Sequence, residues 1–80
     1  MRVSFEIKTH KARGVLLRVI SLFHRLALDL DGLVFKETAE PNVASLHLTL
    51  ECEQEATLRI KAQLLKVVEV VSVETKAGRN

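Results

Sequence analysis

The chain has 80 residues and a formal net charge of +2, with 48% hydrophobic and 28% charged residues, one proline and three glycines. This length fits one domain over residues 1–80, and the composition is typical of a folded globular chain, which excludes a largely disordered one. No uninterrupted apolar run exceeds three residues, whereas a membrane span needs roughly 20. The N-terminus also lacks a signal-peptide pattern, so we expect a cytoplasmic protein that does not bind a membrane.

Charge and cysteine content exclude further classes. Residues 1–25 hold six basic and one acidic side chain (+5), and residues 26–80 hold six basic and nine acidic ones (−3). The three phenylalanines, which are the only aromatics, are not interleaved with a basic stretch, so we expect no nucleic-acid partner and keep that function as a minor alternative. The single cysteine, Cys52, cannot form an intramolecular disulfide or complete a CxxC site and is predicted to be a small core residue.

The first half of the chain predicts a strand, a helix and a second strand. Inward apolar residues alternate with polar ones from Val3 to Ile7, which indicates a half-buried strand. After a polar turn over residues 9–14, apolar residues recur at helical spacing and predict a helix from about Val15 to Leu26. Alternation restarts at Leu28 and loses its phase at residues 31–32, so we expect a strand with a bulge at Gly32 that ends near Thr38.

The second half repeats this pattern after a hairpin loop over residues 39–42, which contains the only proline. Residues 45–52 alternate most regularly and predict a strand whose last inward residue is Cys52. An acidic turn and an apolar stripe over residues 53–66 predict a helix, and the valine-rich residues 67–75 a final strand. Residues 77–80 are expected to form a short frayed tail.

The predicted element order is β-α-β-β-α-β. This order folds most simply as an α+β ferredoxin-like sandwich, a four-stranded antiparallel sheet with both helices on one face. The other sheet face then has no cover, and the edge strands have unpaired backbone groups. A side-by-side homodimer would hide one edge strand and part of that exposed surface.

The sequence offers little catalytic chemistry. The three histidines occupy different predicted elements without metal-site spacing, so we expect them to face solvent and expect no metal site. Asp29 and Asp31 are interpreted as a solvated strand face and not as a general acid and base. The loop Lys11-Ala12-Arg13-Gly14 is different, because its glycine opens a helix whose free N–H groups and positive end favour an anion such as a carboxylate. A solvated basic turn explains the same four residues.

Two blocks of the chain carry a resemblance to a known family. Residues 13–23, RGVLLRVISLF, resemble the G-x-L-x-R-V-x-x-L-F opening of the ACT domain in acetolactate synthase small subunits. Residues 60–70, IKAQLLKVVEV, are similar to that family's I-x-K-Q-L-x-K-L-x-D-V segment and depart from it at Ala62, Val67 and Glu69. The likeness covers nearly the whole chain and fits the short, single-domain kind of small subunit.

The resemblance implies a non-catalytic regulatory subunit, without a cofactor of its own, that binds and activates the large catalytic subunit. That subunit uses thiamine diphosphate to condense two 2-oxoacids in branched-chain amino-acid biosynthesis. In feedback-sensitive members, valine lies at a dimer interface between the first loop of one subunit and the second strand of the other. The resemblance therefore implies a possible effector site at Lys11, Ala12, Arg13, Gly14, Val15 and Asp29.

Lys11 and Asp29 stand where the family typically has asparagines, so we expect a synthase that is insensitive to valine, with an ion pair between them across the interface. Besides nucleic-acid binding, two other functions remain open. One is a free-standing ACT domain that senses a different amino acid. The other is acylphosphatase, which shares the element order but whose loop is matched here only at Gly14, Val15 and Arg18.

Overall fold

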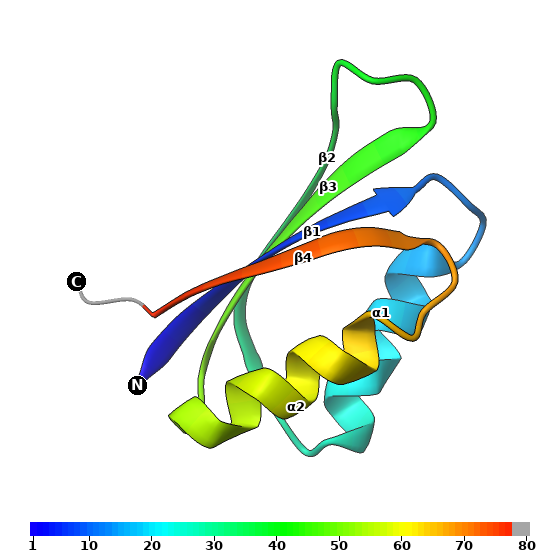
Figure 1. Ribbon diagram of the computed structural model, residues 1–80. Coiled ribbons are helices and arrows are strands. Elements are labelled where there is room, and N and C mark those ends of the chain that lie inside the picture. Colours follow the sequence, from blue (N-terminus) through cyan, green and yellow to red (C-terminus); the bar gives the residue numbers. More distant parts are fainter. Residues whose placement is uncertain (78–80) are drawn as a thin grey trace.

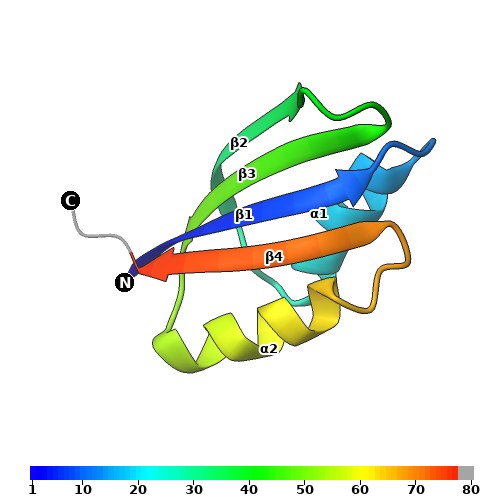
Figure 2. The same ribbon diagram turned by 45° about the horizontal axis from the view of Figure 1, so that its top comes forward.

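The structure, a computed structural model, describes residues 1–77 and contains the six expected elements in the expected order (Figure 1). They are β1 (Arg2–His10), α1 (Val15–Arg25), β2 (Leu30–Glu37), β3 (Val43–Glu51), α2 (Gln54–Leu64) and β4 (Val70–Ala77). The strands form one antiparallel sheet in the order β2-β3-β1-β4. Both helices cover the same sheet face (Figure 2). The predicted α+β ferredoxin-like sandwich is confirmed. Neither helix is long and apolar enough, among these residues, to cross a membrane.

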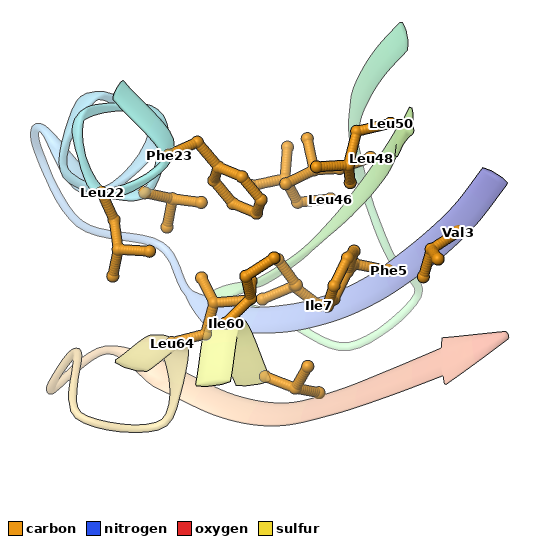
Figure 3. Close-up of a cluster of buried hydrophobic side chains, with 12 residues drawn as sticks. Val3, Phe5, Ile7, Leu22, Phe23, Leu46, Leu48, Leu50, Ile60 and Leu64 are labelled. Atoms are coloured by element: carbon orange, nitrogen blue, oxygen red, sulfur yellow. The ribbon is translucent and has the colours of Figure 1, made fainter. Parts of the chain in front are cut away.

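The core lies between this sheet face and the helices. Alternation in β1 and β3 sends Val3, Phe5, Ile7, Leu46, Leu48 and Leu50 inward, and each is at most 1% exposed. Phe23 from α1 and Ile60 and Leu64 from α2 point into the same cluster (Figure 3). The rings of Phe5 and Phe23 meet edge to face, with centroids 6.0 Å apart and planes at 77°, an arrangement that aromatic pairs favour. Apolar burial between the two layers thus holds the sandwich together.

The predicted bulge in β2 is confirmed. The pairing of β2 with β3 shifts register between Leu30 and Gly32, which leaves Asp31 as the extra residue. A Cβ atom on Gly32 would lie 2.7 Å from Thr49 Oγ1, so this position has no room for a side chain. The strand begins at Leu30, two residues after the predicted start, because Ala27 has a positive φ of 60° and the chain is still turning there.

The start of the last strand was predicted wrongly. Residues 65–69 form a turn and not a strand, and β4 begins at Val70. The Val67 N–H donates to Leu64 O and the Val70 N–H to Val67 O, both at 3.0 Å, so the chain reverses after α2 before it reaches β1. This tertiary requirement overrides the β propensity of the valines. The strand also runs on through Ala77, and residues 78–80 of the predicted tail lie outside the described residues.

Smaller differences concern other element ends. Strand β3 ends at Glu51, although the Cys52 N–H still donates to Met1 O at 3.0 Å. The helices end at Arg25 and Leu64, one and two residues before the predicted ends, which is within the usual uncertainty of helix boundaries. Cys52, predicted to be a small core residue, is only half-buried and packs against the core from outside the buried cluster.

The uncovered sheet face is mostly polar. On this face, the strand pairing places Glu6 of β1 between His47 of β3 and Glu74 of β4. Two residues earlier in β1, Ser4 lies opposite Lys76 on the same face. Covering it would therefore remove little apolar surface from water. The exposed apolar side chains of the sheet are concentrated on the edge strand β2, where Leu33, Val34 and Phe35 are 39–50% exposed. That edge, more than the face, therefore exposes apolar surface to water.

Candidate functional site

The loop between β1 and α1 has the form that an anion site requires. Gly14 is the N-cap of α1 and adopts a left-handed conformation with φ 80° and ψ 1°, which costs a residue with a side chain about 1–2 kcal/mol. No side chain caps the helix, and its first turn contains no acidic residue. The first N–H groups of a helix have no partner within it, so this end of α1 presents donors and a positive dipole end.

The structure brings together the loop residues Lys11, Ala12, Arg13 and Gly14, all of them exposed. Arg13 makes no ion pair within residues 1–77, so its guanidinium remains available beside the helix start. Val15, also predicted as a residue of the effector site, contributes little to the exposed surface of the loop. Its side chain is only 4% exposed, and its N–H donates to Ala12 O at 3.2 Å. Its role is to anchor the first turn of α1 in the core.

Lys11 is held by a contact that the sequence did not suggest. Its Nζ donates to Glu37 Oε2 at 2.8 Å, and its backbone N–H donates to Asn42 O at 2.8 Å. The hydrogen bond from Lys11, with its charge, lowers the pKa of Glu37 from the ordinary carboxyl value. The ionised Glu37 carboxylate therefore stabilises the Lys11 contact fully at pH values above the ordinary pKa of a glutamate. This stabilisation is lost as the pH falls through the lowered pKa. The loop is thus fastened to the end of β2.

Asp29 lies apart from the loop. It follows the C-terminal end of α1, whereas Lys11 and Gly14 precede its N-terminal end. A helix of 11 residues separates its two ends by about 16 Å. Asp29 lines a separate hollow of about 230 Å³ between α1 and β2, with Phe23, His24 and Leu30 among the lining residues. One copy of the chain therefore cannot bring Asp29 and Lys11 into one site.

Thr9 is a polar residue near this loop that sequence reasoning missed. It is 1% exposed, and its hydroxyl has no hydrogen-bond partner among the described residues. The alternation from Val3 through Ile7 predicts that Thr9 also points inward, and this signal could have identified it. A β-bulge with β4 lies between Lys8 and Thr9. The end of β1 that leads into the loop thus contains a buried hydroxyl without a partner.

A second ion pair joins the two blocks that resemble the acetolactate synthase small subunit. Arg18 Nη2 donates to Glu69 Oε2 at 2.5 Å, and the Glu69 side chain is only 22% exposed. Glu69 also accepts the His10 N–H through its backbone oxygen, at 2.8 Å. The first turn of α1, the end of β1 and the turn before β4 are therefore fixed to one another. Glu69, which replaces the aspartate of the family pattern, keeps the carboxylate that this contact needs.

The remaining candidate groups have structural roles. Asp31 accepts a hydrogen bond from Arg2 at 2.6 Å, and His47 pairs with Glu6 on the uncovered sheet face. Burial raises the pKa of the Cys52 thiol above its ordinary value. The N-terminal ammonium acts in the opposite direction and lowers this pKa, whereas the carboxylates of Glu51 and Glu53 raise it further. A raised pKa lowers the thiolate population and with it the reactivity of the thiol. Among residues 1–77, no three histidine, cysteine or acidic side chains gather as metal ligands.

No protein-family model and no curated protein matches the sequence, whereas many solved structures match the fold. The acetolactate synthase small subunit of Thermotoga maritima aligns with a TM-score of 0.87 and 24% identity, over 94% of this chain and 47% of that one. The ACT domain of GTP pyrophosphokinase from Chlorobium tepidum aligns with a TM-score of 0.79 and 14% identity, over 99% of this chain and 89% of that one.

The regulatory subunit of aspartate kinase from Thermus thermophilus gives a TM-score of 0.75 at 9% identity, over 94% of this chain and 50% of that one. This chain has the fold of an ACT domain. It spans about half the length of the Thermotoga maritima small subunit. At these identities, the similarity shows the architecture alone.

We expect Lys11→Met to raise the pKa of Glu37 toward the ordinary carboxyl value, because the substitution removes both the hydrogen bond and the charge that lower it. An NMR titration of the Glu37 side chain measures this pKa directly. Lys36→Met is the matched control, since Lys36 is adjacent in the chain but makes no ion pair within residues 1–77. An equal rise in both variants would show that general charge, and not this contact, sets the pKa.

Proposed function

We propose that this chain is a non-catalytic regulatory subunit of acetolactate synthase and activates the large catalytic subunit. The observation that carries the proposal is the contact between the two resembling blocks, in which Arg18 of the first binds Glu69 of the second. The match of 94% of the chain to the small subunit from Thermotoga maritima supports the same assignment. The aspartate kinase regulatory subunit favours a regulatory role in more general terms.

Activation by a subunit without catalytic groups requires linkage. The regulatory chain must bind the active conformation of the large subunit more tightly than the inactive one, so that binding shifts the population. An amino-acid effector would act through unequal affinity for the two conformations. The chemistry of the reaction would remain with the large subunit and its thiamine diphosphate.

We propose that the chain forms a homodimer through β2. Within residues 1–77, this edge strand has no neighbour on one side in the sheet order, and its unpaired N–H and C=O groups can accept a second strand. Leu33 and Phe35 are paired with the inward residues Leu48 and Leu46 but are still 39% and 41% exposed. A second copy along β2 would cover both the backbone edge and these side chains.

Such a dimer would also complete the candidate site. Antiparallel pairing of two β2 strands about a twofold axis places the start of one strand beside the end of the other. Asp29 directly precedes β2, and Glu37 at its end holds Lys11. Asp29 of one copy would therefore approach the loop of the other. The expected Lys11–Asp29 ion pair would then have to replace the Lys11–Glu37 contact or share the lysine with it.

The chemistry of this site argues against valine as the effector. The helix start with Arg13 and Gly14 can accept the ligand carboxylate. The ammonium group needs oxygen acceptors, and a lysine ammonium offers donors only. Lys11 therefore removes an acceptor and adds like charge where the resembling family has an asparagine. An ACT domain that senses another amino acid is the alternative. Arg13, which has no ion-pair partner within residues 1–77, favours any ligand with a carboxylate.

The chain is expected to be a dimer at tens of micromolar in physiological salt, because β2 carries both an open backbone edge and exposed apolar residues. Light scattering measures the mass. Phe35→Glu should shift the mass to that of a monomer, whereas Leu17→Glu, at an exposed leucine on α1, should leave the dimer intact. A monomeric wild type would contradict the proposal that two copies of the chain share one effector site.

In reconstitution, the purified chain should show no turnover alone but should raise the rate of a cognate acetolactate synthase large subunit severalfold at saturation. The reason is the population shift described above. The measurement is product formation by the large subunit with increasing amounts of the chain, and bovine serum albumin at equal mass is the control. An unchanged rate at saturation would leave the ACT fold intact and reject the assignment to this enzyme.

Valine should bind with a dissociation constant weaker than about 1 mM, which corresponds to about 4 kcal/mol of binding free energy. The physical reason is the repulsion between Lys11 and the ligand ammonium. Calorimetric titration compares the wild type with Lys11→Asn combined with Asp29→Asn. Binding gained only by the double variant supports the argument, and submillimolar binding by the wild type contradicts it.

A further inference from the structure

The outer face of α2 carries an apolar stripe. Leu58 and Ala62 lie in α2 and Leu65 is its C-cap residue, and their spacing at i, i+4 and i+7 places them on one side of the helix. Leu58 is 75% and Leu65 51% exposed, and Ala62 is exposed as well. Val68, in the turn that follows, is 89% exposed. We call Leu58, Ala62 and Leu65 the α2 stripe.

The α2 stripe is not explained by the packing of the domain. Ile60 and Leu64 already bury the opposite side of α2 in the core, with no exposed surface (Figure 3). A surface helix of a globular domain normally shows polar residues on its solvent face. The family segment that residues 60–70 resemble has lysine at the position of Ala62. The substitution of alanine for that lysine makes the stripe continuous in this chain.

Positive charge borders the α2 stripe. Arg59 lies on one side of it and Lys61 on the other, and Lys66 follows in the turn after α2. None of the three makes an ion pair within residues 1–77. Glu55 is the only acidic residue in α2. Glu55 and Arg59 stand at i and i+4, on the same side of the helix, and Glu53 is the N-cap residue. Glu69, after the helix, is bound to Arg18.

We propose that the α2 stripe docks a protein segment whose apolar residues are bordered by carboxylates, such as an acidic amphipathic helix. Apolar contact would bury the two leucines, and the three cations would meet the carboxylates of the partner. A second copy of this chain fits poorly, because it would bring two basic borders together. A lipid surface also fits poorly, since the stripe contains no aromatic residue and is only three residues long. Under the proposed function, on which this part of the inference rests, the segment belongs to the large subunit.

Two designed helical peptides test the surface without reference to any enzyme. Both carry leucines at the spacing of the α2 stripe, one bordered by glutamates and the other by lysines. In an NMR titration, we expect the glutamate peptide to shift the amide signals of residues 54–68 and the lysine peptide to leave them unchanged. Leu58→Ser with Leu65→Ser should weaken this binding about tenfold or more. Leu17→Ser, at a leucine 67% exposed on α1, is the matched control and should bind normally.

Charge-reversal variants distinguish the contribution of the basic border from that of the α2 stripe. Arg59→Glu with Lys66→Glu should abolish binding of the glutamate peptide, whereas Lys36→Glu, a change in β2, should not. All these positions are exposed, and circular dichroism confirms that each variant is folded. The proposal is overturned if neither peptide binds α2 or if the lysine peptide binds equally well. It is also overturned if phosphatidylserine vesicles bind through the same two leucines and the glutamate peptide does not.

The large subunit provides the second arm. If the wild type binds and activates it while Leu58→Ser with Leu65→Ser binds about tenfold more weakly, the α2 stripe is the contact surface. If that variant binds and activates as well as the wild type, the inference fails and the proposed function stands. If the wild type does not bind the large subunit but the glutamate peptide binds α2, the proposed function fails and the docking surface stands.

Discussion

β1 is hydrogen-bonded to β3 along one edge and to β4 along the other, so its inward side chains must be covered by both helices. Phe5 meets Phe23 of α1, and the same row packs against Ile60 and Leu64 of α2. Because burial of these side chains is the main source of stability, the positions of both helices follow from the position of this one strand. The remaining strands and loops are attached around that arrangement.

Ion pairs at the two ends of β1 also fix the position of β2 relative to this central strand. Arg2 binds Asp31 at the start of β2, and Lys11, just past the other end, binds Glu37 at the end of β2. β3 lies between the two strands in the sheet, so each contact spans it. The loop with the candidate anion site therefore has a fixed relation to the edge that we propose as the dimer interface. A change at the loop on binding of an effector would therefore be transmitted to β2 through the contact between Lys11 and Glu37.

Three surfaces of the domain differ in chemistry. The uncovered sheet face is polar, the β2 edge is apolar with open backbone groups, and the outer face of α2 is apolar with a basic border. Figure 2 places β2 and α2 at different sides of the sandwich. The second copy proposed for β2 and the partner segment proposed for α2 would therefore not compete for one surface. This separation suits the regulatory role that we propose.

The sequence by itself determined the element order, the inward residues of β1 and β3 and the bulge near Gly32, because period and turn chemistry are local properties. It also placed the loop with Gly14 at the start of a helix. The tertiary structure alone decided the start of β4, since valines that favour a strand form a turn where the chain must reverse. It also decided the partners of Lys11 and Arg18, which lie 26 and 51 residues away in the chain. No local pattern encodes such pairs, because which strand ends and turns meet is fixed only when the sheet and the core assemble.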